Sequence, residues 1–470
     1  MKRPFLALLE TLEQDDDENY IHLDCVSAKT FEGMAQAGTL SQYSNGEARP
    51  HIASILRVSR ASLGEKLIRR VSRAKERVWL KVWVAEENQL SEDTNIAARF
   101  VSLAGTDNSE GAPGLRISAP VDADPETQAQ AEKFFQTAPG DIADFDELGN
   151  EMEGLEETNQ VHVVAYRVGQ GNCNAVIDGV EHPIVFFDLG WPIQTNKRGA
   201  PSPAPDLLSM TDDEGGRTPV ILSHWDWDHW AYALESWSYN KSRGGAQPVW
   251  KKDALQRPWL VPPDTGLKLG PSHYKLIEDL LRQRNSGIRT LHVWPAKRKS
   301  KAIGNLVLLK CSPAKGVPHN RNDSGLAAFV RINDGRRSGW VLLPGDADFR
   351  SIPIHLLDDE LESEPLVGMV ASHHGGKLPV FSIPETQAPG ARLVVSTGNN
   401  HYGHPNLQML ANYGFLGWKD QVRTDLTAFC SGRCGRPHQV GAFLVQPAHF
   451  AKPQCHCNGI PDARMSIQHS

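Results

Sequence analysis

The chain of 470 residues is too long for one small hydrophobic core, so we expect at least two domains. Its 40% hydrophobic content suffices for globular cores, and its formal charge of −7 gives no general attraction to nucleic acid or membranes. The apolar stretch at the N-terminus is too short for a signal sequence, and no later run has the length of a membrane span. Seven cysteines, an odd number, fit a reducing compartment better than a disulfide framework. These features predict a soluble cytoplasmic protein with no membrane partner.

Residues 1–120 are predicted to form an N-terminal α/β domain, in which no motif points to chemistry. Basic residues concentrate between Arg57 and Lys81, first on a helix-like apolar pattern and then on the alternation of a strand. Such a stretch can contact phosphates, although it is more often a solvated helix face. Both interpretations stay open, and the domain is also a candidate surface for other proteins.

Residues 121–160 are strongly acidic and rich in Pro, Gly and Ala, with Lys133 as the only basic residue between Asp122 and Glu157. Like charges repel one another, so we expect an extended linker here. The alternative is an acidic segment that folds over the basic stretch or over the active site.

Residues 161–425 begin with a series of short strands, and four later apolar runs each end in polar residues. The polar positions are Asp188, the cluster Ser223–Trp230, Asp346 and the pair His373–His374. Strand ends on a rigid sheet are suitable places for a preorganised metal site. The order and combination of these positions indicate a β-rich catalytic domain.

The cluster Ser223–Trp230 places two His and two Asp within six positions, directly after the apolar run Val220-Ile221-Leu222. Imidazole and carboxylate together suit zinc, manganese or iron. The alternative is a solvated turn with local hydrogen bonds. Three interleaved tryptophans make a solvated turn the weaker interpretation.

This pattern resembles the metallo-β-lactamase fold, and most closely the hydrolase domain of the competence protein ComEC and its soluble relatives. The matching motifs lie between Val161 and Tyr413. They are Val168-Gly169-Gln170-Gly171-Asn172, Asp188-Leu189-Gly190, the metal loop with Asp226 at its second ligand position, Asn322-Asp323-Ser324-Gly325-Leu326, Gly345-Asp346, His373-His374-Gly375 and Tyr402-Gly403-His404-Pro405. The resemblance implies an α+β protein with an αββα sandwich, extended by the N-terminal α/β domain and by a Cys-rich C-terminal extension.

The resemblance also implies a site for two divalent ions. The implied ligands are His224, Asp226, Asp228, His229, Asp346 and His374, with Asp346 bridging the ions. Asp188 and Asn322 would support these ligands through hydrogen bonds, and either His373 or His374 could be the ligand of that pair. One histidine position of the wider fold has no clear counterpart, so one site is expected to be carboxylate-rich, which favours manganese or magnesium over tightly bound zinc.

With such a site, an activated water would attack a phosphodiester, and His404 or His373 would protonate the leaving oxygen, with Asp228 at the reacting centre. The resemblance suggests DNA as substrate, and Trp191, Trp225, Trp227 and Trp230 could stack on bases or merely line the pocket. The alternatives are a small-molecule esterase, a lactonase, a cyclic-nucleotide hydrolase, or a sensing or scaffold component of a bacterial defence system.

Residues 426–470 form the Cys-rich C-terminal extension. Cys430, Cys434, Cys455 and Cys457 could close a separate structural zinc site. Neither pair has the common Cys-x-x-Cys spacing, so free thiols in a loop-rich tail are the alternative.

Overall fold

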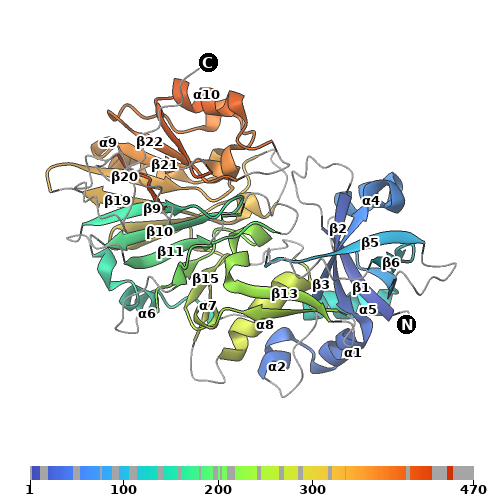
Figure 1. Ribbon diagram of the computed structural model, residues 1–470. Coiled ribbons are helices and arrows are strands. Elements are labelled where there is room, and N and C mark those ends of the chain that lie inside the picture. Colours follow the sequence, from blue (N-terminus) through green and yellow to red (C-terminus); the bar gives the residue numbers. More distant parts are fainter. Residues whose placement is uncertain are drawn as a thin grey trace.

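The computed structural model describes residues 3–10, 20–45, 53–74, 77–86, 95–104, 114–135, 141–156, 160–178, 182–193, 200–201, 204–208, 217–240, 245–263, 269–283, 289–315, 320–333, 335–398, 403–425 and 442–447. Helices and strands are mixed along the chain, which makes this a mixed α/β fold (Figure 1). Within these ranges, no helix combines the length and the hydrophobicity needed to cross a lipid bilayer.

The N-terminal strands close into an antiparallel barrel. Its six strands follow the order β1-β2-β3-β5-β6-β4, and β4 pairs back with β1. They are β1 (Arg3–Glu10), β2 (Tyr20–Ser27), β3 (Ala53–Ser59), β4 (Leu80–Glu86), β5 (Ile96–Val101) and β6 (Leu115–Ile117), and β7 (Val121–Asp122) adds to β4. Leu80, Val82 and Val84 alternate along β4 and are all buried, as the inner positions of a closed barrel require.

Four short helices accompany the barrel, and they are α1 (Ala28–Ala37), α2 (Leu40–Asn45), α3 (Arg60–Leu63) and α4 (Glu65–Arg73). The α/β domain expected for residues 1–120 therefore consists of a β-barrel with helices between its strands. The sequence pattern of β4 and its neighbours alternates, and only the pairing of β1 with β4 reveals that the sheet closes.

Two large mixed sheets follow the barrel in the described chain. The first has the order β24-β9-β10-β11-β12-β15-β16-β8 and the second the order β17-β18-β19-β20-β21-β22-β23. The first contains β8 (Asp141–Ile142), β9 (Val161–Tyr166), β10 (Cys173–Asp178), β11 (Pro183–Leu189), β12 (Val220–Ile221), β15 (Trp259–Val261), β16 (Leu291–Val293) and β24 (Ala442–Leu444). The second contains β17 (Ser300–Ile303), β18 (Leu306–Lys310), β19 (Leu326–Asn333), β20 (Ser338–Leu343), β21 (Leu366–Val370), β22 (Arg392–Val395) and β23 (Asp420–Arg423).

The two sheets share one hydrophobic core. Val161, Val163 and Ala165 of β9 belong to the same buried cluster as Val341 and Leu343 of β20. Because side chains alternate along a strand, Val164 and Tyr166 of β9 face away from this core and join the cluster of the barrel. In Figure 1 the green strands of the first sheet lie directly beside the yellow and orange strands of the second.

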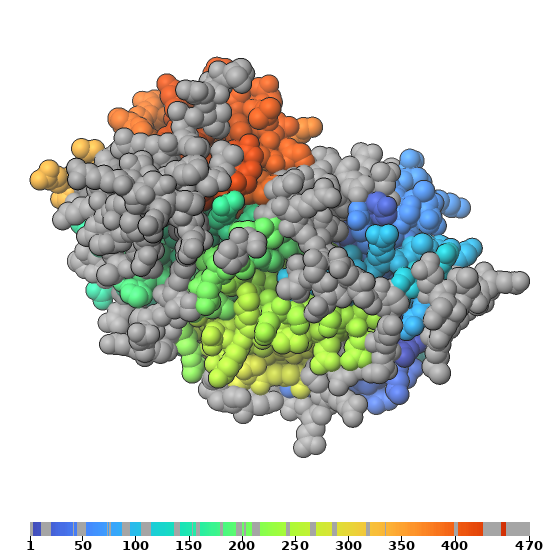
Figure 2. Space-filling model, in the orientation of Figure 1, coloured from blue at the N-terminus to red at the C-terminus, as the bar shows by residue number. Residues whose placement is uncertain are grey.

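Helices cover the outer faces of both sheets. The longest, α8 (Pro271–Arg282), packs with the first sheet and the barrel, while α10 (Leu407–Phe415) packs with the second sheet. The other elements are α5 (Pro125–Phe134), α6 (Phe145–Asn150), α7 (Lys252–Leu255), α9 (Asp358–Ser363) and the hairpin of β13 (Leu234–Asn240) and β14 (Gly245–Trp250). Figure 2 shows the orange residues at the top of the molecule and the blue residues of the barrel at the right, with green and yellow residues in the centre.

The acidic segment 121–160 is largely structured, which differs from the expected extended linker. It contains β7, α5, β8 and α6, and both helices begin at an aspartate that accepts backbone hydrogen bonds, Asp124 and Asp144. Its acidic side chains face the basic stretch, because Arg70 forms a two-fold pair with Asp122 at 2.7 and 2.6 Å, and Arg77 pairs with Glu132 at 3.1 Å. Opposite charges held this close offset the repulsion that predicted a linker.

The barrel is joined to the second part of the chain by a buried aspartate. Asp24 of β2 accepts hydrogen bonds from the backbone N–H of Ser272, at 3.1 Å, and from its hydroxyl, at 2.6 Å. Both groups lie in the first turn of α8, where the N–H groups have no partner within the helix. Asp24 thus binds the start of α8 to the barrel.

The change Asp24→Ala should lower the free energy of unfolding by about 3 kcal/mol, because it leaves a buried N–H and a buried hydroxyl without their charged acceptor. Urea denaturation at neutral pH measures the loss. The matched control is Asp124→Ala at the exposed start of α5, where about 1 kcal/mol is expected. Equal losses in the two variants would contradict the role of Asp24 as a buried link.

The buried His22 of β2 makes stability depend on pH. Burial, together with the charge of Arg57, lowers the pKa of His22 to about 3. As the pH falls below about 6.5, the unfolded chain takes up a proton there while the folded chain does not, so stability declines by roughly 1.4 kcal/mol per pH unit from this group. We expect His22→Leu to lose less stability than the wild type between pH 6.5 and pH 4. Denaturation midpoints at the two pH values test this, and parallel losses in both proteins would refute it.

Candidate metal centre

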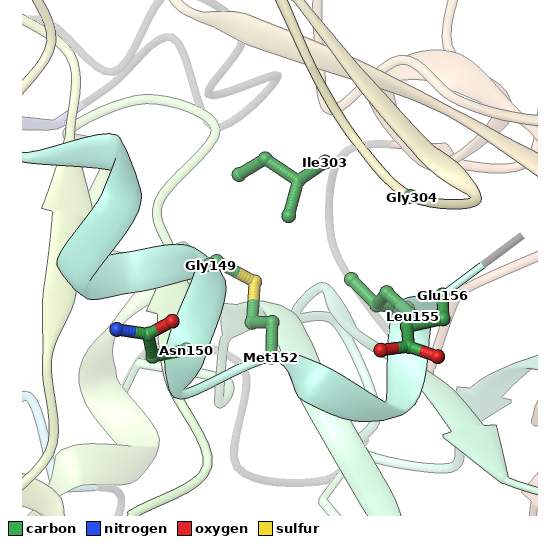
Figure 3. A pocket seen from close by; sticks show the side chains of 7 residues that line it. All are labelled: Gly149, Asn150, Met152, Leu155, Glu156, Ile303 and Gly304. Carbon is green, nitrogen blue, oxygen red and sulfur yellow. The ribbon is translucent and has the colours of Figure 1, made fainter.

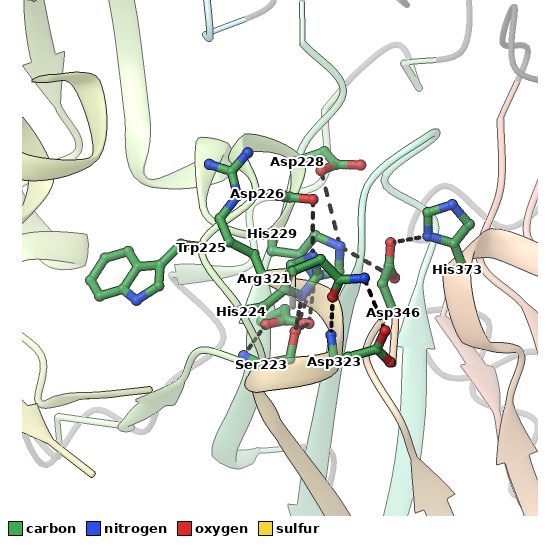
Figure 4. Close-up of polar contacts among 12 residues, drawn as sticks. Ser223, His224, Trp225, Asp226, Asp228, His229, Arg321, Asp323, Asp346 and His373 are labelled. Carbon is green, nitrogen blue, oxygen red and sulfur yellow. Dashed lines mark hydrogen bonds and ion pairs between the residues drawn. The ribbon is translucent and has the colours of Figure 1, made fainter. Parts of the chain in front are cut away.

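The predicted ligands gather where parallel strands of the two sheets end. Strands β11 and β12 run parallel in the first sheet and lead to Asp188 and His224, while β20 and β21 run parallel in the second and lead to Asp346 and His374. The carboxyl ends of parallel strands meet at one edge of a sheet, which is where α/β proteins place their ligands. Figure 4 shows the loop after β12 facing Asp346 and His373 across the site.

Three imidazoles are oriented so that each presents its Nε2 atom to the site. Nδ1 of His224 donates to the hydroxyl of Ser223 at 2.9 Å, Nδ1 of His229 donates to Asp188 at 2.8 Å, and Nδ1 of His374 donates to the carbonyl of Ser396 at 2.8 Å. All three Nε2 atoms are buried and have no hydrogen-bond partner among the described residues. A buried lone pair without a partner is costly, and a ring fixed through its other nitrogen is typical of metal ligands.

Two carboxylates complete the cluster. Asp346 Oδ1 lies 3.4 Å from Nε2 of His229, and Asp228 Oδ2 lies 3.4 Å from Nε2 of His374. Two groups could therefore hold a metal ion, and they are His224, His229 and Asp346, and Asp228, His229 and His374. The unpartnered Nε2 and Oδ1 atoms fit a divalent cation that accepts nitrogen and oxygen donors.

His229 belongs to both groups, although its Nε2 has one lone pair and can bind one ion only. The five donors can thus form a single site around His229, or two sites if another donor replaces His229 in one of them. Asp226 is a further donor close to His224, since its Oδ2 lies 3.4 Å from Nε2 of His224. Asp226 is therefore a candidate third donor for an ion at His224 and Asp346.

Asp188 forms hydrogen bonds to two residues of the loop that carries the candidate ligands. Its carboxylate accepts the backbone N–H of Ser223 at 2.7 Å and the hydroxyl of Ser223 at 2.8 Å, in addition to Nδ1 of His229. Because the single hydroxyl proton of Ser223 goes to Asp188, the same oxygen is left to accept from His224. One carboxylate thus fixes the orientation of two imidazoles.

The backbone is strained at the same place. Among the described residues, the non-glycine residues with positive φ are Asp188 at 65°, His373 at 53° and His374 at 53°. Such conformations cost about 1–3 kcal/mol each and persist where the surroundings enforce them, often at functional sites. The chain accepts this cost to direct these side chains into the cluster.

The glycine turn of the sequence pattern packs against the metal loop. The backbone N–H of Asn172 donates to the carbonyl of Asp228 at 3.2 Å, and Gly190 donates to the carbonyl of Asn172 at 2.8 Å. A Cβ on Gly190 would lie 2.1 Å from the Asp228 carbonyl, so only glycine allows this approach. The Asn172 side chain binds Asn174 at 2.8 Å, which makes it part of the local order rather than of the ligand set.

The surroundings raise the pKa values of His229 and His374. Burial alone would lower the pKa of His229, but Asp188 and Asp346 outweigh it and raise that pKa well above its usual value. Burial likewise opposes the charge of Asp346, but His229, His374 and His373 hold its pKa well below its usual value. Carboxylates that keep their charge under such burial attract a cation, whether protons or a metal ion.

His373 and His404 lie at the border of the cluster. Nδ1 of His373 is 2.9 Å from Asp346 Oδ2, and its ring meets that of His404 edge-on with 5.3 Å between the centroids. Burial, with the charges of His373 and His374, lowers the pKa of His404 to about 3. His404 is therefore uncharged at neutral pH and carries no extra proton to donate, whereas the sequence suggested it as a proton donor.

The tryptophans around the metal loop are part of the core. Trp225, Trp227 and Trp230 are at most 2% exposed, and their indole N–H groups bind the Pro262 carbonyl, the Ser272 hydroxyl and the Trp225 carbonyl. Trp191 is also buried, and Figure 4 shows Trp225 pointing away from the ligands. Their burial supports the interpretation that these tryptophans belong to the hydrophobic core. None of them presents an exposed ring face on which a base could stack.

The described residues also include a cavity of about 410 Å³, which is separate from the ligand cluster (Figure 3). It is lined by Gly149, Asn150, Met152, Leu155, Glu156, Ile303 and Gly304. These residues come from α6, the turn that follows it and the β17–β18 hairpin, and none of them is a predicted ligand. The cavity therefore offers no chemical group to the metal centre.

Several sequence predictions fall outside the described residues, namely the zinc site of Cys430, Cys434, Cys455 and Cys457, and also Tyr402. Asn322 is described and buried in the turn before β19, and its Oδ1 has no hydrogen-bond partner among the described residues. The hydrogen bonds of this turn come from its neighbour, because Asp323 accepts the backbone N–H of Asp348 at 2.9 Å. Asp323 thereby ties the turn to the loop that carries Asp346.

Three contributors were missed by the sequence analysis, namely Ser223, Ser396 and Arg321. Ser396 directly follows the apolar strand β22, so the strand-end pattern that identified Asp346 could also have identified it. Arg321 forms an ion pair with Asp226 at 2.9 Å from a distant part of the chain, and no local pattern signals this contact.

The chain was compared with known proteins. No protein-family model matches it, and no curated protein matches it. Matching solved structures include the crystal structure of CmlA, a diiron beta-hydroxylase from Streptomyces venezuelae, with 16% identity and a TM-score of 0.24. A mutant of CmlA beta-hydroxylase matches with 16% identity and a TM-score of 0.22, and each match covers 44% of this chain and 34% of the other.

The chain thus spans about a third of the length of those enzymes, and TM-scores this low carry no argument about fold or activity. The comparisons do correct the resemblance to the hydrolase domain of ComEC. That prediction is wrong, because neither a family model nor a curated protein matches and the structures found are those of a diiron beta-hydroxylase. Short motifs of glycine, aspartate and histidine describe a kind of strand-end site and do not by themselves identify a family.

Removal of single ligands should remove bound metal. We expect Asp346→Ala and His374→Ala each to lower the number of divalent ions bound per chain after reconstitution, because each leaves unfilled donors in the cluster. Metal analysis by mass spectrometry after dialysis measures the change. The matched control is Asp348→Ala, which removes a neighbouring buried aspartate that pairs with Arg350 and belongs to neither ligand group. Full metal content in the two ligand variants would exclude this cluster as the binding site.

Proposed function

We propose that the chain is a metal-dependent hydrolase of phosphodiesters, built on a metallo-β-lactamase-like αββα arrangement of its two sheets. The observation that supports this most is the convergence of three buried, unpartnered Nε2 atoms on two carboxylates at the ends of parallel strands. No serine or cysteine nucleophile is needed in such a site. Divalent ions held by these donors would activate water and polarise a phosphoryl oxygen.

The residues of the chain divide the remaining tasks. Asp188, Ser223 and Ser396 hold the imidazoles in one tautomer and orientation. His373, fixed to Asp346 through Nδ1, has a buried Nε2 without a hydrogen-bond partner and can deliver a proton to a leaving oxygen. His404 stays uncharged beside it, with its ring edge-on to that of His373.

The contacts around the site favour a small phosphodiester over DNA. The two features that suggested DNA are engaged within the protein, since Arg70 and Arg77 pair with Asp122 and Glu132, and the tryptophans are buried. A polymer would need a basic surface along which its backbone could lie. Hydrolysis of DNA is therefore one arm of the experiment rather than the expected result.

The test uses protein reconstituted with manganese or zinc and offers bis-p-nitrophenyl phosphate, cyclic nucleotides, and linear and single-stranded DNA. Small diesters should be hydrolysed, and His373→Gln should lower kcat by about a hundredfold with the metal content retained, because only the proton donor is lost. The control Asp348→Asn should keep its activity.

Each of three other results contradicts part of the proposal. Cleavage of DNA alone would make the protein a nuclease. An intact metal centre that hydrolyses no ester would exclude hydrolysis. A protein that retains iron and consumes dioxygen would indicate oxidation chemistry in place of hydrolysis.

A further inference from the structure

Arg321 connects three parts of the molecule at the back of the metal centre. It directly precedes the turn of Asn322, and its side chain is 14% exposed. Its Nε lies 2.9 Å from Asp226 Oδ1, its Nη1 lies 3.0 Å from Nε2 of His273 in α8, and its Nη2 donates to Glu10 at the end of β1. Figure 4 shows Arg321 lying beside Asp226.

A cation in this position needs its partners. Burial lowers the pKa of Arg321 to about 10, which still leaves the guanidinium charged at neutral pH. A buried charge is tolerated only when it is paired, and here both paired carboxylates are themselves shielded, with Glu10 at 6% and Asp226 at 19% side-chain exposure. The planar guanidinium also fixes the direction of each partner, which a lysine would not.

The contact with Arg321 involves one carboxylate oxygen of Asp226 and leaves the other available to bind an ion. Oδ1 forms an ion pair with Arg321 without an aligned hydrogen bond, and Oδ2 lies 3.4 Å from Nε2 of His224, which has no hydrogen-bond partner among the described residues. His229 can serve one ion only, so a site at His224 needs a donor other than His229 besides Asp346. Asp226 Oδ2 is placed to be that donor, provided that its rotation is prevented.

We propose that Arg321 is a positioning residue that holds Asp226 as the ligand of a His224–Asp346 ion site, and that Glu10 of the barrel holds Arg321 in place. This rests on the metal centre of the proposed function and adds that the N-terminal barrel controls one of its two ions. The other ion takes Asp228, His229 and His374, which have no contact with Arg321 among the described contacts.

The experiment measures metal binding directly, without turnover. Cobalt(II) is titrated into metal-free wild type, Arg321→Lys and Glu10→Gln, and calorimetry and visible absorption report the number, affinity and coordination of the bound ions. The wild type should bind two ions. Both variants should keep one ion with wild-type affinity and bind the other about 10- to 100-fold more weakly, the range typical for loss of a residue that orients a ligand.

The matched control is Arg331→Lys. Arg331 of β19 pairs with Glu364 at 2.6 Å, so it is also an arginine paired with a carboxylate. Among the described contacts, it has none with a candidate ligand. This variant should bind both ions like the wild type. Near-ultraviolet circular dichroism checks that each variant is folded. If Arg321→Lys does not fold, Glu10→Gln is the deciding variant, because it replaces one carboxylate oxygen by an amide nitrogen and keeps nearly the same side-chain shape.

Unchanged affinity for both ions in folded Arg321→Lys and Glu10→Gln would overturn the inference and reduce Arg321 to a structural link. Equal weakening of both ions would overturn it too, since the effect would then not be specific to the site of His224. The proposed function fails separately, if wild type with two bound ions hydrolyses no ester. In that case the difference in affinity between the two ions would still establish the role of Arg321.

Discussion

The structure depends on one constraint, which is that ionisable side chains are buried together at the ends of strands from two sheets. Burial penalises each charge, so the cluster is tolerable only if every atom finds a partner. Ser223, Asp188 and Ser396 satisfy the Nδ1 atoms, while the Nε2 atoms and one oxygen of Asp346 have no partner within the described chain. This division into partnered and unpartnered atoms is the physical basis for a metal centre. The positive φ angles at Asp188, His373 and His374 show that the backbone is strained at the same place.

The N-terminal barrel belongs to the same arrangement. Asp24 binds the start of α8, Arg321 brings Glu10 of the barrel to Asp226 of the metal loop, and His22 lies edge-on to Trp227 with 5.9 Å between the ring centroids. The hydrophobic core of the barrel continues into that of the first sheet without a break. A region that shows no chemical motif in the sequence can therefore support the site through buried polar contacts.

Two features that suggested a DNA substrate change their meaning in the folded chain. Two residues of the basic stretch, Arg70 and Arg77, pair with acids from the segment that was expected to be a linker. The tryptophans beside the ligands fill the core and use their N–H groups internally. Composition and proximity in sequence indicate which residues lie near the site, but not the direction in which each side chain points. That direction decides whether an aromatic ring can stack on a ligand or packs within the protein.

The sequence by itself indicated the candidate ligand positions along the chain, because polar residues that directly follow a buried strand lie at the edge of the sheet where that strand ends. His224, Asp228, His229, Asp346 and His374 could be found this way, and so could the support from Asp188. Closure of the barrel, the folding of the acidic segment and the contact of Arg321 with Asp226 were decided only by the tertiary structure. Each of these depends on contacts between residues far apart in the chain, and no local pattern of hydrophobicity or charge encodes such a contact.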